Sequence, residues 1–270
     1  MEKILVSVII ATYNREDLIV RALKSVLGQT FLDYEIIVVD DGSIDGTKVK
    51  VLNFVSDKVK YFYQKNTGLD TARDFGISNA KGEYIAILDS DDYWADDDKL
   101  RKQVEFLDEN EDYVLVGGNI IAVDELGKKI NRKDNILLMD HKIRQKILIE
   151  NPIAHSTVMY RKSAWSKVGG YGKNSCGFSE DWNLWLKMGK IGKLSNLNED
   201  FTYLQVAKGY SFFWKKRSVW LDLKLRVDHR KKYPNFAKGY TLGLLYYLSF
   251  FIPFRKYMRF CFYKICKVNL

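Results

Sequence analysis

Short apolar runs alternate with segments of helical periodicity through the first half of this 270-residue chain. The runs lie near 4–11, 34–40, 59–63 and 83–88. Residues 17–27 and 71–80 between them repeat apolar side chains at helical spacing. A strand, a crossover helix and a parallel strand produce this order. The pattern therefore predicts an α/β fold with a mostly parallel central sheet flanked by helices, to which Tyr113–Val123 adds a further strand.

Polar residues follow three of the predicted strands directly. They are Thr12-Tyr13-Asn14, Asp40-Asp41-Gly42-Ser43 and Asp89-Ser90-Asp91-Asp92. In an open α/β sheet, ligands bind in the crevice outside the carboxyl ends of the strands. We therefore expect these three segments to converge on one ligand-binding crevice.

The third segment places three carboxylates within four positions. Their mutual repulsion raises the energy of the ionised groups unless a cation offsets it. Hard carboxylate oxygens select Mg²⁺ or Mn²⁺, and Mg²⁺ is usually held with one or two carboxylates and substrate phosphates. The segment therefore predicts a metal-bound phosphate, with a solvated acidic turn as the alternative. Arg73, whose guanidinium matches phosphate geometry, is a candidate contact to that phosphate unless it is an ordinary helix-surface charge.

Cysteine and charge content indicate the compartment and the partner. The three cysteines are odd in number and lack metal-ligand spacing, which supports neither a disulfide framework nor a zinc site and fits a reducing cytosol. Residues 208–270 contain 15 Lys or Arg and 2 Asp or Glu, whereas residues 1–207 contain 28 and 32. A strongly basic segment indicates an anionic partner, either nucleic acid or a membrane surface.

The end of the chain combines this charge with aromatic residues. Residues 242–254 are almost wholly apolar, but a bilayer crossing needs about 20 such residues, and Pro253 interrupts the run. Beyond Pro253, apolar and aromatic residues recur at helical spacing and Lys or Arg fill other positions, which is typical of a helix lying in a membrane interface. We expect peripheral attachment to a membrane surface through residues 241–267. A helical pair packed on the preceding domain, or used as a dimer contact, is the alternative.

Four motifs together resemble those of family 2 glycosyltransferases. They are Val6–Arg15, Val38–Ser43 with Asp45-Gly46-Thr47, Asn66-Thr67-Gly68 with Ala72-Arg73, and Asp89–Asp92. The resemblance covers residues 4–206 and implies a GT-A fold, a nucleotide-sugar donor, Mn²⁺ or Mg²⁺ at the Asp-x-Asp segment, and inversion at the anomeric carbon. We accordingly expect a catalytic domain over 1–207, with a donor-binding half near 1–112 and an acceptor-binding half near 113–207. A basic, aromatic, helical and membrane-associating extension is expected over 208–270.

The resemblance also implies roles for single residues. Tyr13 is expected to stack on or border the base, and Asp41, with Asp40 beside it, to accept a hydrogen bond from the uracil imide. Asp89 is expected beside the ribose and the metal, and Asp91 is expected to be the main metal ligand. The full expected donor-binding set is Thr12, Tyr13, Asn14, Asp40, Asp41, Arg73, Asp89 and Ser90.

Transfer to a hydroxyl also requires a base, because the acceptor hydroxyl loses its proton as the new bond forms. Glu180 and Asp181 precede a Trp-rich helical pattern, where N-capping is the alternative role. The family pattern of a Glu-Asp pair before such a helix favours Asp181 as the general base, with Glu180 and Trp182 on the acceptor or phosphate side. His155 lies in a segment resembling the one that faces the donor phosphate or acceptor, and Gly169–Gly172 resembles the family's flexible acceptor loop.

We therefore expect a metal-dependent inverting glycosyltransferase that moves a sugar from a UDP-type donor to a hydroxyl of a glycan, lipid-linked or otherwise membrane-proximal, in surface polysaccharide synthesis. Its expected place is the cytoplasm, peripheral on the inner face of the cell membrane, and homo-oligomerisation stays open. The alternative is a nucleic-acid or membrane binding protein with a non-catalytic α/β scaffold. Repulsion between the acidic crevice and a phosphate polymer argues against nucleic acid as a partner.

Overall fold

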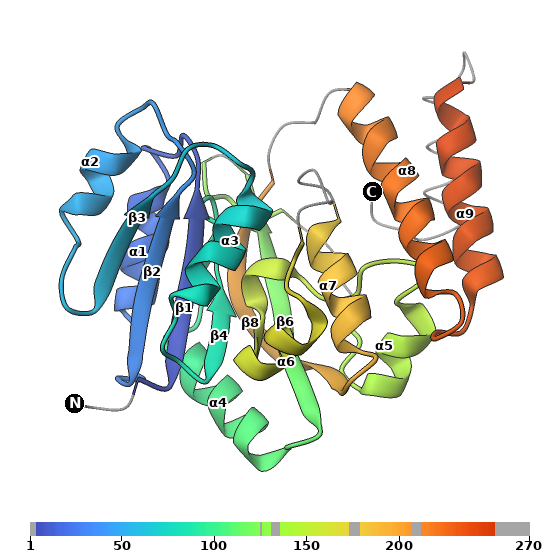
Figure 1. Ribbon diagram of the computed structural model, residues 1–270, viewed down its shortest axis with the longest axis horizontal. Helices are drawn as coiled ribbons and strands as arrows, with labels where there is room; N and C mark the ends of the chain where they lie inside the picture. Colours follow the sequence, from blue (N-terminus) through green and yellow to red (C-terminus); the bar gives the residue numbers. More distant parts are fainter. Residues whose placement is uncertain (1–3, 125, 131–135, 173–178, 207–211, 252–270) are drawn as a thin grey trace. The chain divides into compact units, whose positions relative to one another are not determined.

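The structure is a computed structural model that describes residues 4–124, 126–130, 136–172, 179–206 and 212–251. Its chain divides into two compact units (Figure 1). The first comprises Met1–Asp140 and Ile153–Ala207, and the second comprises His141–Pro152 and Lys208–Leu270. All the strands belong to the first unit.

One eight-stranded sheet forms the centre of the first unit, in the order β3-β2-β1-β4-β7-β6-β8-β5. The strands are β1 (Val6–Thr12), β2 (Tyr34–Asp40), β3 (Val59–Tyr63), β4 (Tyr84–Ile87), β5 (Tyr93–Trp94), β6 (Tyr113–Val123), β7 (Met159–Arg161) and β8 (Lys193–Gln205). The predicted strands β1 to β4 and β6 are confirmed, and β1 to β4 pair in parallel. Strands β5, β7 and β8 were not predicted.

The expectation of a mostly parallel sheet is confirmed for β1 to β4, whereas the rest of the sheet is mixed. Strand β7 runs antiparallel to both β4 and β6, and β5 runs antiparallel to β8, whereas β6 and β8 are parallel. Strands β5 and β7 are only two and three residues long. An antiparallel strand needs no helical crossover, so the βαβ pattern that marks parallel strands in the sequence is missing there. The fold is therefore mixed α/β.

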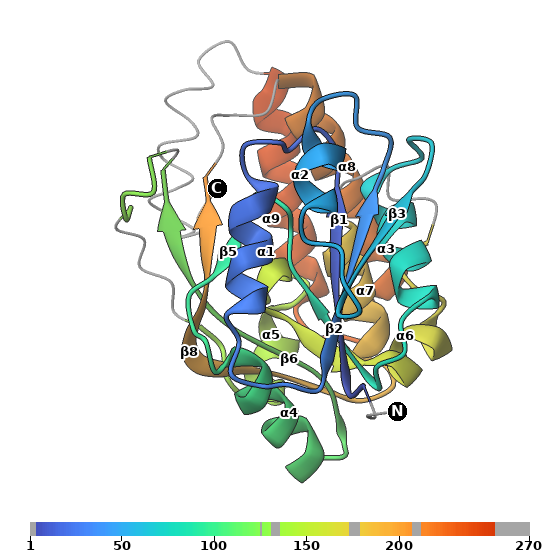
Figure 2. The same ribbon diagram turned by 90° about the vertical axis from the view of Figure 1, so that its left-hand side faces the viewer.

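The helices of the described residues are α1 (Ile19–Leu27), α2 (Thr47–Leu52), α3 (Leu69–Ser78), α4 (Lys99–Glu109), α5 (Asp140–Lys146), α6 (Lys162–Val168), α7 (Glu180–Met188), α8 (Phe212–His229) and α9 (Phe236–Leu248). Of these, α1 and α3 cover opposite faces of the parallel strands. Figure 2 shows α1 and α3 on opposite sides of β1 to β3. Val8 and Ile10 of β1 belong to the core cluster that also contains residues of α1 and α4, whereas Ile9 faces α3. Burial on both faces explains why these strands are continuous apolar runs.

Helix α3 lies unusually close to the sheet because of Gly76. A Cβ atom at Gly76 would lie 3.0 Å from methyl groups of both Ile9 and Val39. Arg73 lies one turn earlier on the same buried side of α3. The small residue therefore lets α3 approach β1 and β2, and this approach positions Arg73 near the ends of the strands.

The second unit is helical. Arg226 of α8 donates hydrogen bonds from Nε and Nη2 to the carbonyl oxygens of Leu148 and Ile149, at 2.9 and 3.0 Å. Gly239 of α9 packs on the same segment, where a Cβ atom would lie 1.9 Å from the Leu148 oxygen. Among the helices described, none combines the length and the apolar character needed for a membrane crossing. Residues 254–267, predicted as an interfacial helix, lie outside the described residues.

Candidate active site

The carboxyl ends of β1 and β2 are joined by hydrogen bonds between their loops. Asp41 N–H donates to the Thr12 carbonyl at 2.8 Å. Asn14, with a left-handed φ of 52°, accepts from the Ile44 N–H at 2.9 Å and donates its own N–H to Ser43 Oγ at 2.9 Å. The two predicted polar segments therefore form one wall, as the convergence of strand ends requires.

Asp40 and Asp41 are buried and supplied with donors from their own surroundings. Asp41 accepts from Gln64 Nε2 at 2.7 Å and from the Thr67 and Gly68 N–H groups at 2.9 Å each. Asp40 accepts from the Ser43 N–H and the Tyr61 hydroxyl, both at 2.8 Å. A carboxylate offers about four lone-pair positions, so Asp41 retains capacity for one further donor.

Thr12 and Tyr13 offer two different surfaces at the end of β1. The Thr12 hydroxyl is buried and has no hydrogen-bond partner among the described residues. Tyr13 is 37% exposed, so its ring is available to a planar ligand. Ser90, also a member of the predicted donor set, is buried after the end of β4.

The carboxylate of Asp89 is held from two sides. Arg73 Nη2 lies 2.7 Å from Asp89 Oδ1, and Arg73 Nη1 lies 3.0 Å from Glu180 Oε1. His155 Nδ1 lies 3.1 and 3.0 Å from the two Asp89 oxygens. Although burial acts in the opposite direction, the charges of His155 and Arg73 hold the pKa of Asp89 well below its usual range.

This network unites predicted residues that are far apart in the sequence. Arg73 joins the end of β4 to the start of α7, where Glu180 and Asp181 form the first turn, as predicted. Arg73 is buried with its guanidinium between two carboxylates, so the structure gives it a bridging position; its predicted phosphate contact stays a prediction. Trp182 follows on the buried side of α7.

The environment of Asp91 and Asp92 favours the ionised carboxylate less than that of Asp89 does. Burial, followed by the Asp89 charge, raises the pKa of Asp91. Burial and the charges of Asp89 and Asp91 raise the pKa of Asp92 to about 8. One cation is close to Asp91, where Arg15 Nη2 lies 3.5 Å from Oδ2. The end of β4 therefore has more negative charge than its cations balance.

A divalent cation would fit this donor set. Among the described residues, no three His, Cys, Asp or Glu side chains are grouped to hold an ion by themselves. Mg²⁺, however, is usually held by one or two carboxylates together with substrate phosphates. Burial raises the pKa of Asp91 and the charge of Asp89 adds to the shift, so a bound cation would stabilise the ionised form of Asp91. Asp89 and Asp91 are the residues suited to hold it.

Asp181 has the protonation behaviour of a candidate base. Burial raises its pKa to about 6, with Glu180 adding to the shift and His155 opposing it. Its Oδ1 accepts the Trp182 N–H at 2.6 Å, a local hydrogen bond at the helix start. A carboxylate with a pKa near the working pH is well matched to taking a proton from a hydroxyl. Capping of α7 and base chemistry are therefore compatible in one residue.

Three residues of the site were not predicted. Tyr171 donates to or accepts from His155 Nε2 at 2.8 Å, Asp74 binds the loop that carries Tyr171, and Ser156 Oγ hydrogen-bonds Asp92. Glycine spacing drew attention to residues 169–172 as a flexible segment, but no pattern in the sequence indicates that Tyr171 is buried. These roles follow from contacts between residues that lie 16 to 97 positions apart in the sequence.

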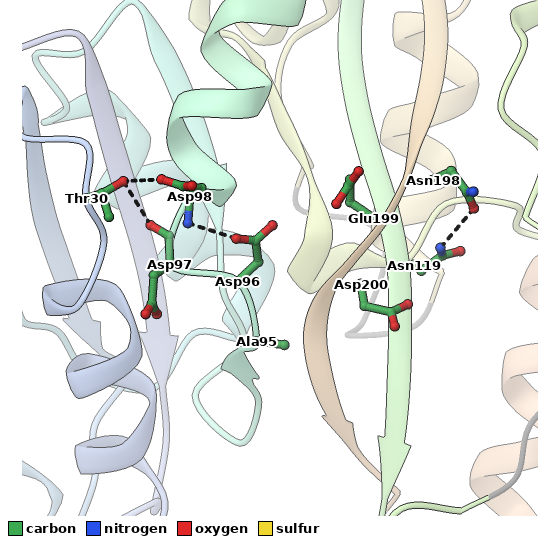
Figure 3. A pocket seen from close by; sticks show the side chains of 9 residues that line it. All are labelled: Thr30, Ala95, Asp96, Asp97, Asp98, Asn119, Asn198, Glu199 and Asp200. Atoms are coloured by element: carbon green, nitrogen blue, oxygen red, sulfur yellow. Dashed lines mark hydrogen bonds between the residues drawn. The ribbon is translucent and has the colours of Figure 1, made fainter.

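A separate acidic hollow of about 690 Å³ shares no residue with this site. Figure 3 shows its lining, which is Thr30, Ala95, Asp96, Asp97, Asp98, Asn119, Asn198, Glu199 and Asp200. Helix α4 begins at Lys99, and Asp98 at the cap position makes no side-chain cap. Its carboxylate instead pairs with Thr30 and Arg101, and the Asp96 carboxylate accepts the Asp98 N–H.

Comparison with known proteins agrees with this arrangement. A model of the family "Glycosyl transferase family 2" matches residues 7–169. The chain is 32% identical over 209 residues to a glycosyltransferase of Rickettsia conorii, covering 77% of this chain and 34% of that protein. It is 28% identical over 249 residues to the amylovoran biosynthesis glycosyltransferase AmsE of Erwinia amylovora, covering 90% and 91%. The chain therefore spans about a third of the Rickettsia relative and nearly all of AmsE.

Solved structures share the fold at low sequence identity. S. aureus TarS residues 1–349 superpose with a TM-score of 0.64 at 21% identity, covering 93% of this chain and 72% of TarS. The mannosyltransferase PcManGT of Pyrobaculum calidifontis superposes with a TM-score of 0.66 at 18% identity, covering 90% and 69%.

The mixed sheet and the likeness to TarS show a mixed α/β, GT-A-like fold. The chain belongs to glycosyltransferase family 2. Membership of this family favours an enzyme over the alternative of a non-catalytic scaffold.

Proposed function

We propose that this protein transfers a sugar from a UDP-sugar to a hydroxyl of a glycan, with inversion at the anomeric carbon and with a divalent cation. The observation that carries the proposal is the Arg73 bridge, which brings the carboxylates at the end of β4 and the start of α7 into one site. TarS has been solved with UDP and with UDP-GlcNAc, and PcManGT with GDP-Man and Mn²⁺. AmsE acts in amylovoran biosynthesis, which supports a polysaccharide as the product.

Each part of the donor has a matching group in the proposal. Tyr13 would border the base, and the remaining acceptor capacity of Asp41 would receive the imide N–H of uracil. Thr12, whose buried hydroxyl lacks a partner, Asn14, Asp40 and Ser90 would complete the wall around the nucleoside. Asp89 and Asp91 would hold Mn²⁺ or Mg²⁺, which as a Lewis acid stabilises the negative charge of a leaving diphosphate.

Asp181 is proposed as the base. The proton of the acceptor hydroxyl would pass to its carboxylate as the hydroxyl oxygen attacks the anomeric carbon. Glu180 is held by Arg73, and Trp182 is buried, so both would keep the first turn of α7 in place beside the acceptor. Burial around Asp181 and His155 would also limit the access of water, which competes with the acceptor.

The test is turnover of a panel of nucleotide sugars in Mn²⁺ or Mg²⁺, with release of the nucleoside diphosphate as the readout. The wild-type protein is expected to act on a UDP-sugar and to stop when the cation is chelated. Asp181→Asn removes the proton acceptor without changing the size of the side chain, and it should lower turnover by about 10²- to 10⁴-fold. Wild-type turnover by Asp181→Asn, or turnover that chelation does not affect, would contradict the assigned roles.

We further propose that residues 1–207 carry the chemistry and that residues 208–270 bind a membrane surface, which suits a lipid-linked acceptor. Trp220 of α8 and Phe251, in the 3-10 turn that follows α9, are 57% and 60% exposed. Lys216 Nζ lies 4.1 Å from the Phe251 ring centroid, and the Trp220 and Tyr247 ring centroids are 5.7 Å apart. Exposed aromatic rings beside a lysine match the interface of an anionic membrane.

Sedimentation with vesicles tests the membrane proposal. The wild-type protein should bind vesicles that contain an anionic lipid and should bind neutral vesicles less. The variant Trp220→Ser with Phe251→Ser should lose most of this binding and keep its turnover of soluble donor. Ile44→Ser, at an 88% exposed position of the first unit, is the matched control. Equal binding by both variants would exclude this surface.

A further inference from the structure

Residues 169–172 are anchored rather than loosely attached. The Asp74 carboxylate accepts hydrogen bonds from Trp165 Nε1 at 2.8 Å, the Tyr171 N–H at 3.0 Å and the Gly172 N–H at 3.1 Å. Gly170 has a φ of 64°, and a Cβ atom there would lie 2.6 Å from Asp74 Oδ1. Only glycine allows this approach without displacing the carboxylate. The segment expected to be a flexible acceptor loop is therefore fixed to α3 over these residues.

The same segment is also held by the helix that carries the candidate base. Lys187 of α7 donates a hydrogen bond to the Gly170 carbonyl. Tyr171 is fully buried, and the Arg73 guanidinium lies 5.7 Å from its ring centroid. Helices α3 and α7 therefore hold Tyr171 at a defined place, with its hydroxyl against His155.

Hydrogen-bond directions follow from the chemistry of the groups. A carboxylate only accepts, so His155 Nδ1, at 3.0 to 3.1 Å from both Asp89 oxygens, carries a proton and donates. In a neutral imidazole the other nitrogen then has a lone pair, and it accepts from the Tyr171 hydroxyl at 2.8 Å. The chain of contacts thus runs from Asp74 through Tyr171 and His155 to Asp89.

We propose that Tyr171 is a positioning residue for the reaction. Its hydroxyl holds the His155 ring so that Nδ1–H points at Asp89, and Asp74 holds Tyr171 by its backbone. The Asp89 carboxylate then has a fixed orientation, because His155 binds it on one side and Arg73 on the other. The functional part of this inference rests on the proposed use of Asp89 beside the donor and the cation. Hydrogen bonds to the partners of a metal ligand commonly affect metal affinity or rate by about 10- to 100-fold.

The first test needs no activity and no metal. Long-range ¹H–¹⁵N spectra of the metal-free protein report which imidazole nitrogen carries the proton, and the chain has only three histidines to assign. In these spectra His155 should carry a proton on Nδ1, the nitrogen that faces Asp89. Tyr171→Phe should shift the Nε2 resonance of His155, because its donor is lost, and leave His141 and His229 unchanged. A proton on Nε2 in the wild type, or an unchanged Nε2 signal in the variant, would overturn the proposal.

The second test is kinetic. Tyr171→Phe should lower kcat by about 10- to 100-fold and raise the Mn²⁺ concentration needed for half-maximal rate, with the KM of the donor changed by less than about threefold. Asp74→Asn should act in the same direction, because the amide nitrogen no longer accepts. If the hydroxyl contributed only to packing, the variant would have a lower thermal midpoint but would not combine a lower kcat with a nearly unchanged donor KM.

Tyr34→Phe is the matched control. It removes another buried tyrosine hydroxyl, which donates to the Val26 carbonyl at 2.9 Å, away from the residues of the site. It should lower stability and leave kcat within about twofold of the wild type. Equal kcat for Tyr171→Phe and Tyr34→Phe would refute a positioning role. If the wild type turns over no nucleotide sugar, the proposed function fails. The His155 spectra would still show whether the hydrogen bonds from Tyr171 through His155 to Asp89 exist.

Discussion

The ends of β2 and β4 both carry adjacent aspartates, but the carboxylates have different partners in the two regions. Asp40 and Asp41 are surrounded by uncharged donors from nearby loops. Asp89, in contrast, is paired with Arg73 and His155, and burial raises the pKa of Asp91 and of Asp92 beside it. The first pair therefore builds a rigid wall, whereas the second cluster is short of positive charge.

This difference separates two uses of the same side chain. A carboxylate that accepts three fixed N–H groups stabilises a loop and costs little when no ligand is bound. A group of carboxylates with raised pKa values is unfavourable without a cation, and it becomes favourable when a cation and a diphosphate bind. We therefore expect substitutions at the end of β4 to affect the rate, and substitutions at the end of β2 to affect stability and donor affinity.

The largest effect is expected for Asp91→Asn. The substitution removes the carboxylate best placed to hold a cation, and the rate of donor turnover in Mn²⁺ should fall by about 10³-fold or more. Because burial and Asp89 raise the pKa of Asp91, its charge opposes folding at neutral pH, so the thermal midpoint should not fall. Turnover above about a tenth of the wild-type rate would contradict the comparison.

The pH dependence of the rate is expected to follow Asp181. The base acts in its ionised form, and its pKa is raised to about 6, so kcat/KM should rise about tenfold per pH unit below pH 6 and level off above it. The measurement is kcat/KM for the donor with saturating acceptor between about pH 4.5 and 8. A profile that levels off near pH 4 would show that Asp181 is not the group that limits the rate.

Protonation of Asp181, which should lower the rate, should raise the stability of the fold. A folded-state pKa raised above that of the unfolded chain means that the folded protein binds the proton more tightly, so this group stabilises the fold at low pH and loses that contribution as the pH rises through about 6. Asp181→Asn should therefore raise the thermal midpoint at pH 8 relative to the wild type, and the difference should shrink at pH 5. A lower midpoint at pH 8 would indicate that capping of α7 outweighs this charge effect.

A smaller and different effect is expected for Asp41→Asn. The amide keeps one accepting oxygen and turns an NH₂ group toward N–H donors at Thr67 or Gly68, which should cost about 1–3 kcal/mol of unfolding free energy. The donor KM should rise while kcat stays within about threefold, since this wall binds the ground state and the transition state alike. Denaturant unfolding and initial rates measure the two effects. A loss of kcat as large as that of Asp91→Asn would remove the distinction between the strand ends.

The two regions also differed in how far the sequence predicted them. Strands β1, β2 and β4 are buried on both faces and are followed by polar residues, so local patterns located both the strands and Asp40, Asp41, Asp89 and Asp91. Strands β5 and β7 are two and three residues long and β8 is rich in polar residues, so none of them forms an apolar run, and all three were missed. The contacts of His155 with Tyr171, and of Arg73 with Glu180, join positions 16 and 107 residues apart. No local pattern contains such contacts, because they form only when these distant segments come together in the folded chain.

The smallest effect is expected in the acidic hollow of Figure 3, which tests whether acidity alone makes a site. Asp97 is exposed there, and its backbone carbonyl, not its carboxylate, accepts the Thr30 N–H. Asp97→Asn should change turnover by less than about twofold and stability by less than about 0.5 kcal/mol, because an exposed carboxylate is well solvated and screened by salt. The hollow is lined by four aspartates against three at the end of β4, but they are not buried against one another as Asp89, Asp91 and Asp92 are. A rate loss comparable to that of Asp91→Asn would mean that total negative charge, and not the burial of Asp89, Asp91 and Asp92 together, defines the functional site.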